Sequence, residues 1–214
     1  MIEIKIFPHN LYQMNAYLLY DESGEGVLID AGNSNDEELQ EIVNFTEQKD
    51  IQLKMLLNTH AHIDHIVGND AIIEKFGLKL YAHKAGLNFY KTISQYGSAL
   101  GFSISQTHLP DVFIKDGDDL EFGNTKLKVL YTPGHADGSI CFYDAENKYV
   151  VVGDVLFQQS IGRTDLPTGD FDILAESIRS KLYTLPDETT VFPGHGPSTQ
   201  ISYEKMDNPF VSAW

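Results

Sequence analysis

The sequence feature that most constrains this chain is the segment Leu56–Asn69, LLNTHAHIDHIVGN. Three histidines and one aspartate, His60, His62, Asp64 and His65, fall within six positions directly after an apolar run that predicts a buried strand. With this chain's own His and Asp frequencies, the pattern HxHxDH arises by chance in roughly one chain of this length in a thousand. Four such groups would desolvate one another at a cost, which a bound cation would turn into binding energy. Neutral imidazole and carboxylate are ligands of Zn²⁺ and non-haem iron, so the cluster predicts a metal site.

A metal site needs ligands from other parts of the chain, because the residues of one turn cannot surround an ion. Three later segments each offer one. YTPGHADGS places His135 after a strand, VVVGDVLF places Asp154 after another, and VFPGHGPS places His195 after a third. Each segment consists of a buried strand, a glycine-containing turn and a ligand-type side chain. Taken singly, each of these residues is more often structural, but together with HxHxDH they favour one shared metal site. The predicted metal ligands are His60, His62, Asp64, His65, His135, Asp154 and His195.

The remaining histidines lack this setting. We expect His9, after an edge strand, and His108, in an irregular loop, to lie at the surface. His83 ends the strand LKLYA and could line the site or order a nearby loop.

The order of elements predicts an α/β (α+β) chain with strands in both halves and helices between them. A helix is expected after an N-cap at Asn35 or Ser34, another is expected to end at Gly77, and FDILAESIRSKLYTL predicts a third. Such a pattern favours two sheets packed face to face, each covered on its outer side by helices. Because no repeat, low-complexity tract or linker interrupts the sequence, we expect a single domain over residues 1–214.

The negative charge of the chain argues against nucleic acid and membrane surfaces as partners. The chain carries 31 Asp plus Glu against 15 Lys plus Arg, a net charge of −16, which would repel nucleic acid and anionic lipid. A small-molecule substrate is therefore expected.

Cys141 is the only cysteine and lies in a strand pattern, so we expect it to be buried like an apolar residue. With no leader-like segment and no membrane-spanning apolar run, we expect a cytoplasmic protein.

The arrangement HxHxDH, a distant GH, a strand-end Asp and then PGH resembles the metallo-β-lactamase-fold superfamily, over nearly the whole chain. Within it, GDVLFQQSIGRTDLPTGD resembles the glyoxalase II-like, or hydroxyacylglutathione hydrolase-like, hydrolases. The resemblance implies a four-layer αββα sandwich with the metal site at the sheet edges. It also implies that the chain lacks the C-terminal helical domain with which full-length glyoxalase II grips glutathione.

The same resemblance implies a role for each ligand. His60, His62 and His135 would hold one metal, Asp64, His65 and His195 would hold a second, and Asp154 would bridge the two.

Two divalent ions, Zn²⁺ or Fe or Mn, can share a hydroxide that attacks a carbonyl carbon. This implies hydrolysis of an acyl thioester such as S-lactoylglutathione, with Asp64 as the catalytic residue that orients the hydroxide.

A mono-iron persulfide dioxygenase is the main alternative. Such enzymes resemble this chain in the GRTD segment, Gly162–Asp165, and would hold iron by His60, His135 and Asp154. We expect Arg163 to pair with Asp165 or Asp170 and so to order the loop beside the metals. Lesser alternatives are a lactone or other ester hydrolase and a non-catalytic metal-stabilised scaffold.

Two other activities are disfavoured by single residues. Two-zinc β-lactamases of this superfamily have a cysteine where Asp154 stands, and the diiron oxygen- and nitric-oxide-reducing members have Glu where His62 stands.

Overall fold

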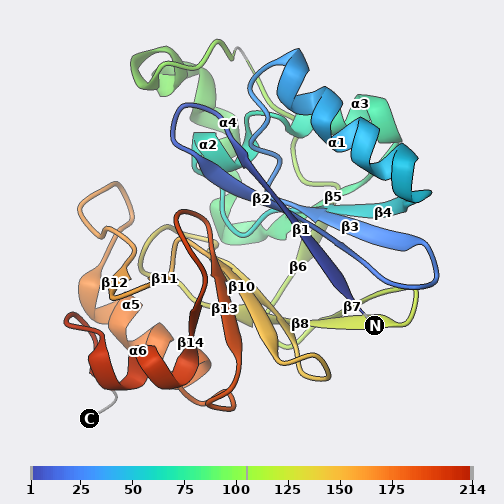
Figure 1. Cartoon of the computed structure of the whole chain (residues 1–214). Helices are drawn as coiled ribbons and strands as arrows, with labels where there is room; N and C mark the ends of the chain where they lie inside the picture. Colours follow the sequence, from blue (N-terminus) through green and yellow to red (C-terminus); the bar gives the residue numbers. More distant parts are fainter. Residues whose placement is uncertain (1, 105, 213–214) are drawn as a thin grey trace.

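Two six-stranded sheets packed face to face form the centre of the computed structural model, which describes residues 2–104 and 106–212 (Figure 1). Met1, Ser105 and the last two residues lie outside the described part. The first sheet has the order β1 (Glu3–His9), β2 (Met14–Tyr20), β3 (Glu25–Ile29), β4 (Gln52–Leu57), β5 (Leu80–His83) and β6 (Val112–Ile114). The second has the order β14 (Thr199–Gln200), β13 (Thr190–Pro193), β10 (Tyr149–Gly153), β9 (Ile140–Asp144), β8 (Thr125–Tyr131) and β7 (Asp119–Phe122). A short hairpin of β11 (Leu156–Phe157) and β12 (Ser160–Ile161), which the sequence did not predict, follows β10.

Helices cover the outer face of each sheet, which gives the four layers expected from the sequence (Figure 1). The helices on the side of the first sheet are α1 (Asp36–Lys49), α2 (Ile63–Ile66), α3 (Asn69–Phe76), η1 (Lys84–Gly86), α4 (Leu87–Tyr96) and η2 (Gly97–Leu100). Those on the side of the second sheet are α5 (Phe171–Ser177), η3 (Ile178–Leu182) and α6 (Ile201–Asp207). The third predicted helix therefore forms, but its second half, η3, is a π-helix. Within the described residues, no helix is both long and apolar enough to cross a membrane.

Strand alternation produces three apolar layers. In β2, for example, Tyr17 and Leu19 point into the core between the sheets, whereas Leu18 points outward into the core beneath the helices. Cys141 lies in the outer core of the second sheet and is fully buried, as predicted.

The predicted helix boundaries hold at two caps. The Asn35 side chain accepts a hydrogen bond from the Glu38 N–H at the start of α1, and Gly77 ends α3 in the left-handed conformation.

His9 is buried, so the prediction that it lies at the surface is wrong. It occupies the last position of β1, where side chains two apart share a face, and so it follows Phe7 under α1. The two rings stack 5.6 Å apart, and the His9 ring is 3.6 Å from a carboxylate oxygen of Glu41. His108 lies at the surface, as expected, with a partly exposed side chain whose ring is 3.1 Å from Asp111.

The sheets carry the carboxyl ends of several strands to one edge of the molecule. β3 and β4 are parallel, and so are β10 and β13. β8 runs in the same direction as β10 because both are antiparallel to β9. At this edge an isolated bridge between Met14 and His195 links the two sheets, and the Asn15 N–H donates to the Gly194 carbonyl at 2.7 Å. The segments that follow these strands therefore meet at the edge.

Candidate metal centre

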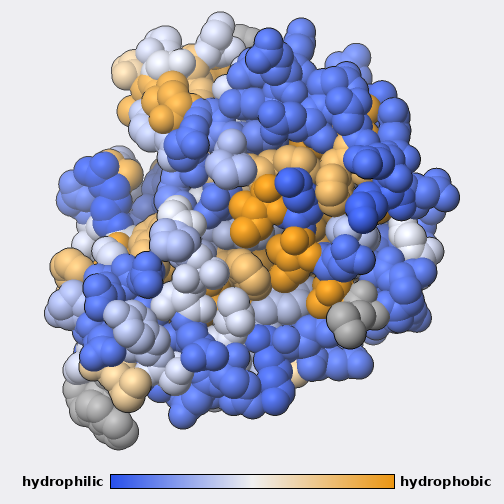
Figure 2. Space-filling view, viewed as in Figure 1, coloured by the Kyte–Doolittle hydropathy of each residue, from blue (hydrophilic) through white to orange (hydrophobic). Residues whose placement is uncertain are grey.

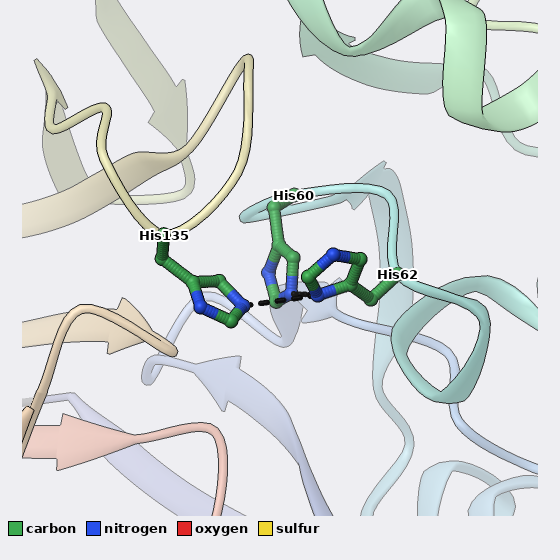
Figure 3. Close-up of side chains that lie close together, drawn as sticks. All are labelled: His60, His62 and His135. Carbon is green, nitrogen blue, oxygen red and sulfur yellow. Dashed lines mark hydrogen bonds between the residues drawn. The ribbon is translucent and has the colours of Figure 1, made fainter. Parts of the chain in front are cut away.

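Three imidazoles converge on one point at this edge. Nδ1 of His62 lies 3.2 Å from Nε2 of His60 and 2.9 Å from Nε2 of His135 (Figure 3). We call these three residues the histidine triad. In a tetrahedral site with Zn–N bonds of about 2.1 Å, two ligand nitrogens lie about 3.4 Å apart. The triad is therefore arranged as three ligands of a single ion would be. His60 and His62 lie in the loop between β4 and α2, and His135 lies in the turn after β8.

A second group of ligand atoms lies beside the triad. Oδ2 of Asp64 is 3.1 Å from Nε2 of His195 and 3.6 Å from Nε2 of His65. We call Asp64, His65 and His195 the mixed set. Its members come from α2 and from the turn after β13.

Asp154 lies between the two groups. Its Oδ1 is 3.4 Å from Nε2 of His65, and its Oδ2 is 3.7 Å both from Nε2 of His135 and from Nε2 of His195. The carboxylate thus faces one imidazole of the triad and two of the mixed set. All seven residues predicted as ligands are brought together, and their role as metal ligands stays a prediction.

The unpaired atoms of this cluster fit a bound cation. Nε2 of His65 and Oδ1 of Asp154 are buried and have no hydrogen-bond partner among the described residues. Leaving such a group unpaired costs about 1–3 kcal/mol, which a cation would offset. Gly194 keeps the space open, because a Cβ there would lie 2.7 Å from Cε1 of His65 and closer still to Oδ1 of Asp154.

Asp30 lies against the same cluster, and the sequence analysis missed it. Its Oδ2 accepts hydrogen bonds from Nδ1 of His65 at 2.9 Å and from the Thr59 hydroxyl at 2.6 Å, and its Oδ1 accepts from the Thr59 N–H at 2.8 Å. Because a carboxylate can only accept, Nδ1 of His65 carries the proton and Nε2 is left free for a metal. The signal was present in VLIDAG, which again places an acidic residue directly after a buried strand.

Backbone carbonyls orient two further imidazoles in the same way. Nδ1 of His135 donates to the Arg163 carbonyl at 2.8 Å, and Nδ1 of His195 donates to the Tyr12 carbonyl at 3.1 Å. Both contacts leave Nε2 free to bind a metal.

Electrostatics divides the cluster into two parts. Burial lowers the pKa of each triad histidine, to about 3 for His62, so the triad is neutral near pH 7. Burial alone would also lower the pKa of His65, but the carboxylates of Asp64, Asp154 and Asp30 raise it well above its ordinary value. Burial alone would raise the pKa of Asp154, but the facing imidazoles, His65 first among them, hold it well below its usual range. Asp154 is therefore an ionised carboxylate.

The cluster opens into a cavity of about 300 Å³. In Figure 2 the surface is hollowed between the segment that follows α4 and the loop that follows β12. Apart from cluster members, the cavity is lined by Tyr12, Ile63, Tyr96, Leu100, Arg163 and Leu166. Most of this wall is apolar.

Of the two partners expected for Arg163, the structure shows Asp165. The guanidinium makes two hydrogen bonds to Asp165, of 2.8 and 2.7 Å, whereas Asp170 instead accepts from the Ile173 N–H at the start of α5. His83 does not line the cavity. It stacks on Tyr131 at 4.3 Å and accepts from the Ala85 N–H, and so it orders the turn after β5.

Comparison with known proteins gives one family match, which spans residues 9–195 and is described as the metallo-beta-lactamase superfamily. The hydroxyacylglutathione hydrolase GloC of Haemophilus influenzae is 35% identical over 214 residues, 99% of each chain. The probable metallo-hydrolase YqgX of Bacillus subtilis is 37% identical over 208 residues, 97% of this chain and 96% of its own.

Comparison with solved structures also finds similar folds along nearly the whole chain. BLEG-1, a B3 metallo-beta-lactamase, has a TM-score of 0.89 at 34% identity, covering 99% of both chains. TTHA1623 in a di-iron-bound form has a TM-score of 0.87 at 35% identity, covering 97% of this chain and 100% of its own. ETHE1 from Myxococcus xanthus has a TM-score of 0.79 at 29% identity, covering 98% of this chain and 84% of its own.

Proposed function

The chain belongs to the metallo-β-lactamase superfamily, and from this membership we propose that it hydrolyses acyl thioesters such as S-lactoylglutathione with two divalent metal ions. The observation that carries the proposal is the position of Asp154, whose carboxylate faces both the triad and the mixed set. One ion would be held by the triad and the other by the mixed set, with Asp154 shared. Zinc, iron and manganese all suit such His and Asp ligands.

Bound at these positions, two divalent cations would supply a hydroxide nucleophile at neutral pH and stabilise negative charge on the reacting carbonyl. The protein's part is to hold the ligand atoms and the nucleophile in place. The neutral triad imidazoles are ready to bind without losing a proton. Asp64 lies in the cavity wall as a carboxylate, because the neighbouring imidazoles lower its pKa although burial alone would raise it. It can therefore accept a hydrogen bond from the attacking group and orient it.

The thioester substrate class is supported by similarity and by the cavity. GloC of Haemophilus influenzae, a hydroxyacylglutathione hydrolase, matches almost the entire chain. The apolar side chains of Ile63, Leu100 and Leu166 in the cavity wall suit an acyl group.

A mono-iron persulfide dioxygenase is the second candidate. The GRTD segment favours it. So does the distance of 3.7 Å between Nε2 of His135 and Oδ2 of Asp154, because these two residues and His60 would form a two-histidine, one-carboxylate iron site.

One preparation distinguishes these reactions. Metal is counted per chain in the purified protein, and cleavage of S-lactoylglutathione is measured beside oxygen uptake with glutathione persulfide. We expect two metals and thioester turnover. A single iron with oxygen consumption would overturn the proposal. A β-lactam should be included because BLEG-1 is 34% identical, and the expected result with it is no turnover.

A pair of aspartate variants ties the activity to the cluster. D154A should abolish turnover, because it removes the carboxylate that both groups of ligands face. D144N is the matched control. Asp144 is more deeply buried than Asp154, and it accepts from the Glu146 and Asn147 N–H groups in the turn after β9, outside the cluster. Wild-type turnover in D154A would show that the ligand assignment is wrong.

A further inference from the structure

We propose that the outer edge of β1 pairs with β1 of a second copy of this chain, so that two chains form a twofold-symmetric dimer. β1 lies at the end of the first sheet, where it pairs with β2. A strand in this position leaves every second N–H and carbonyl without a partner in the sheet, which makes its edge a template for another strand.

The hydrogen bonds of the first sheet show which backbone groups of β1 face outward. The Asp21 N–H donates to the Glu25 carbonyl, so β2 bonds to β3 through Asp21 and every second residue before it. β2 bonds to β1 through the residues in between, whose partners in β1 are Glu3, Lys5, Phe7 and His9. The other residues of β1 direct their backbone groups away from β2, and these groups have no hydrogen-bond partner among the residues that the structure describes. They are Ile4, Ile6 and Pro8.

Pro8 limits the registers in which a second strand can pair. A proline has no N–H to donate to a ladder, so it is found where that side of a strand stays unpaired. Pairing centred on Ile6 would place Pro8 opposite Ile4 of the partner subunit and lose a hydrogen bond there. Pairing centred on Ile4 extends from Ile2 to Ile6 and leaves Pro8 outside the paired segment.

Charge favours the same register. When Ile4 faces Ile4 of the partner subunit, Glu3 faces Lys5 of the partner subunit, and the twofold axis repeats this pair. Because Glu3 and Lys5 direct their hydrogen bonds to β2, they form the non-hydrogen-bonded pairs of the new ladder, in which side chains lie closest. Nζ of Lys5 lies over the ring of Phe7 at 5.2 Å and makes no ion pair within the described part of the chain. The dimer would give this ammonium group a carboxylate.

The inner face of β1 adds apolar contact. Ile2, Ile4 and Ile6 pack against the core between the sheets but remain partly exposed. Figure 2 shows hydrophobic surface that runs along β1. In the dimer Ile4 meets its own copy, and Ile2 meets Ile6 of the partner subunit. Pairing therefore removes this apolar row from water and joins the first sheets of the two copies into one.

Sedimentation velocity of the full chain over a range of concentrations tests the proposal. Because each chain has a net charge of −16, the salt concentration should be about 0.15 M, where repulsion between exposed charges is screened beyond about 8 Å. We expect a dimer. K5E and E3K each place like charges opposite one another, so each should weaken dimerisation roughly tenfold or more.

A mixture of the two variants makes the test specific to this register. K5E and E3K should form a heterodimer, because both pairs then join opposite charges again. Recovery of the dimer would also show that both variants are folded. The matched control is K115E, which makes the same charge change in the turn after β6, at the opposite edge of the first sheet. It should dimerise like the wild type.

Three results would overturn the inference. A wild-type protein that stays monomeric at every concentration would leave the edge of β1 to a strand of another protein or to solvent. A dimer that K5E and E3K leave intact would place the interface elsewhere. K5E and E3K that do not associate when mixed, although each has the wild-type Tm, would rule out the register. The proposed function stands in each case, because thioester turnover is measured separately.

Discussion

Replacing Asp30 by Asn should weaken one metal position more than the other. Asp30 lies beyond the ligands and accepts three hydrogen bonds, from Nδ1 of His65 and from the N–H and hydroxyl of Thr59. Asn fits the backbone, because the φ of +57° at this position lies in the left-handed region that Asn tolerates. The side-chain amide, however, has only one acceptor oxygen.

Either orientation of the amide in D30N creates a conflict. With its oxygen facing the Thr59 N–H, its NH₂ group faces the proton on Nδ1 of His65. That repulsion favours the other tautomer of His65, in which Nε2 carries the proton and cannot bind a metal. With its oxygen facing His65, the NH₂ group instead faces the Thr59 N–H, and the negative charge behind His65 is lost.

The expected magnitude is a 10- to 100-fold loss of affinity at the mixed set, in the range found when the partner of a metal-bound histidine is removed. This corresponds to about 1.4–2.8 kcal/mol. The triad should lose less affinity, because its link to Asp30 is indirect: the Thr59 hydroxyl, which donates to Asp30, lies 3.1 Å from Nδ1 of His60.

Metal-free D30N would be titrated with Zn²⁺ in competition with a chromophoric chelator, beside the wild type and D144N. In D30N we expect one strongly weakened site and one site whose affinity falls less, and in D144N two unchanged sites. Two unchanged sites in D30N would refute the role given to Asp30. Equal weakening of both sites would show that the effect spreads through the fold rather than through His65.

Three further predictions concern the same cluster and its loop. In G194A, the added Cβ would occupy the space between His65 and Asp154, so the affinity of the mixed set should fall roughly tenfold or more; two tightly bound metals after gel filtration would contradict this. Acidification should release metal from the mixed set before the triad. Burial alone would lower the pKa values of His65 and His195, but the surrounding carboxylates raise both. A metal must therefore displace protons from these two histidines, whereas the triad histidines, whose pKa values are lowered, are already neutral. Metal content after dialysis between about pH 8 and pH 5 checks the order, and simultaneous loss would argue against it. D165N should leave Tm unchanged, because the pair of Arg163 and Asp165 is exposed on both sides; a clear fall in a thermal melt would mean that this pair stabilises the fold.

Much of the fold could be predicted because its periodicity is strong. The alternation in β8, the short apolar runs in β2 and β10, and the caps at Asn35 and Gly77 mark elements whose type local sequence decides. The hairpin β11–β12 was not predicted, because strands of two residues carry no period. The π-helical half of the third predicted helix was missed because a change in hydrogen-bond register leaves no mark on an apolar pattern.

The site was predictable as far as its residues share one local pattern, a buried strand followed by a turn and a ligand-type side chain. Asp30 shows the same pattern. Sequence alone, however, cannot distinguish an aspartate that would bind a metal from one that accepts a hydrogen bond from Nδ1 of a histidine ligand, as Asp30 does with His65. His9 shows the opposite failure. A histidine at the end of an edge strand looks solvated until the helix that covers it is in place.

The most direct measurement is anomalous diffraction from crystals of the metal-loaded protein, recorded at the absorption edge of the metal it contains. We expect two peaks about 3.5–4 Å apart, one within the histidine triad and the other within the mixed set, with the Asp154 carboxylate between them. A single peak held by His60, His135 and Asp154, or no peak at this edge of the sheets, would contradict the proposal.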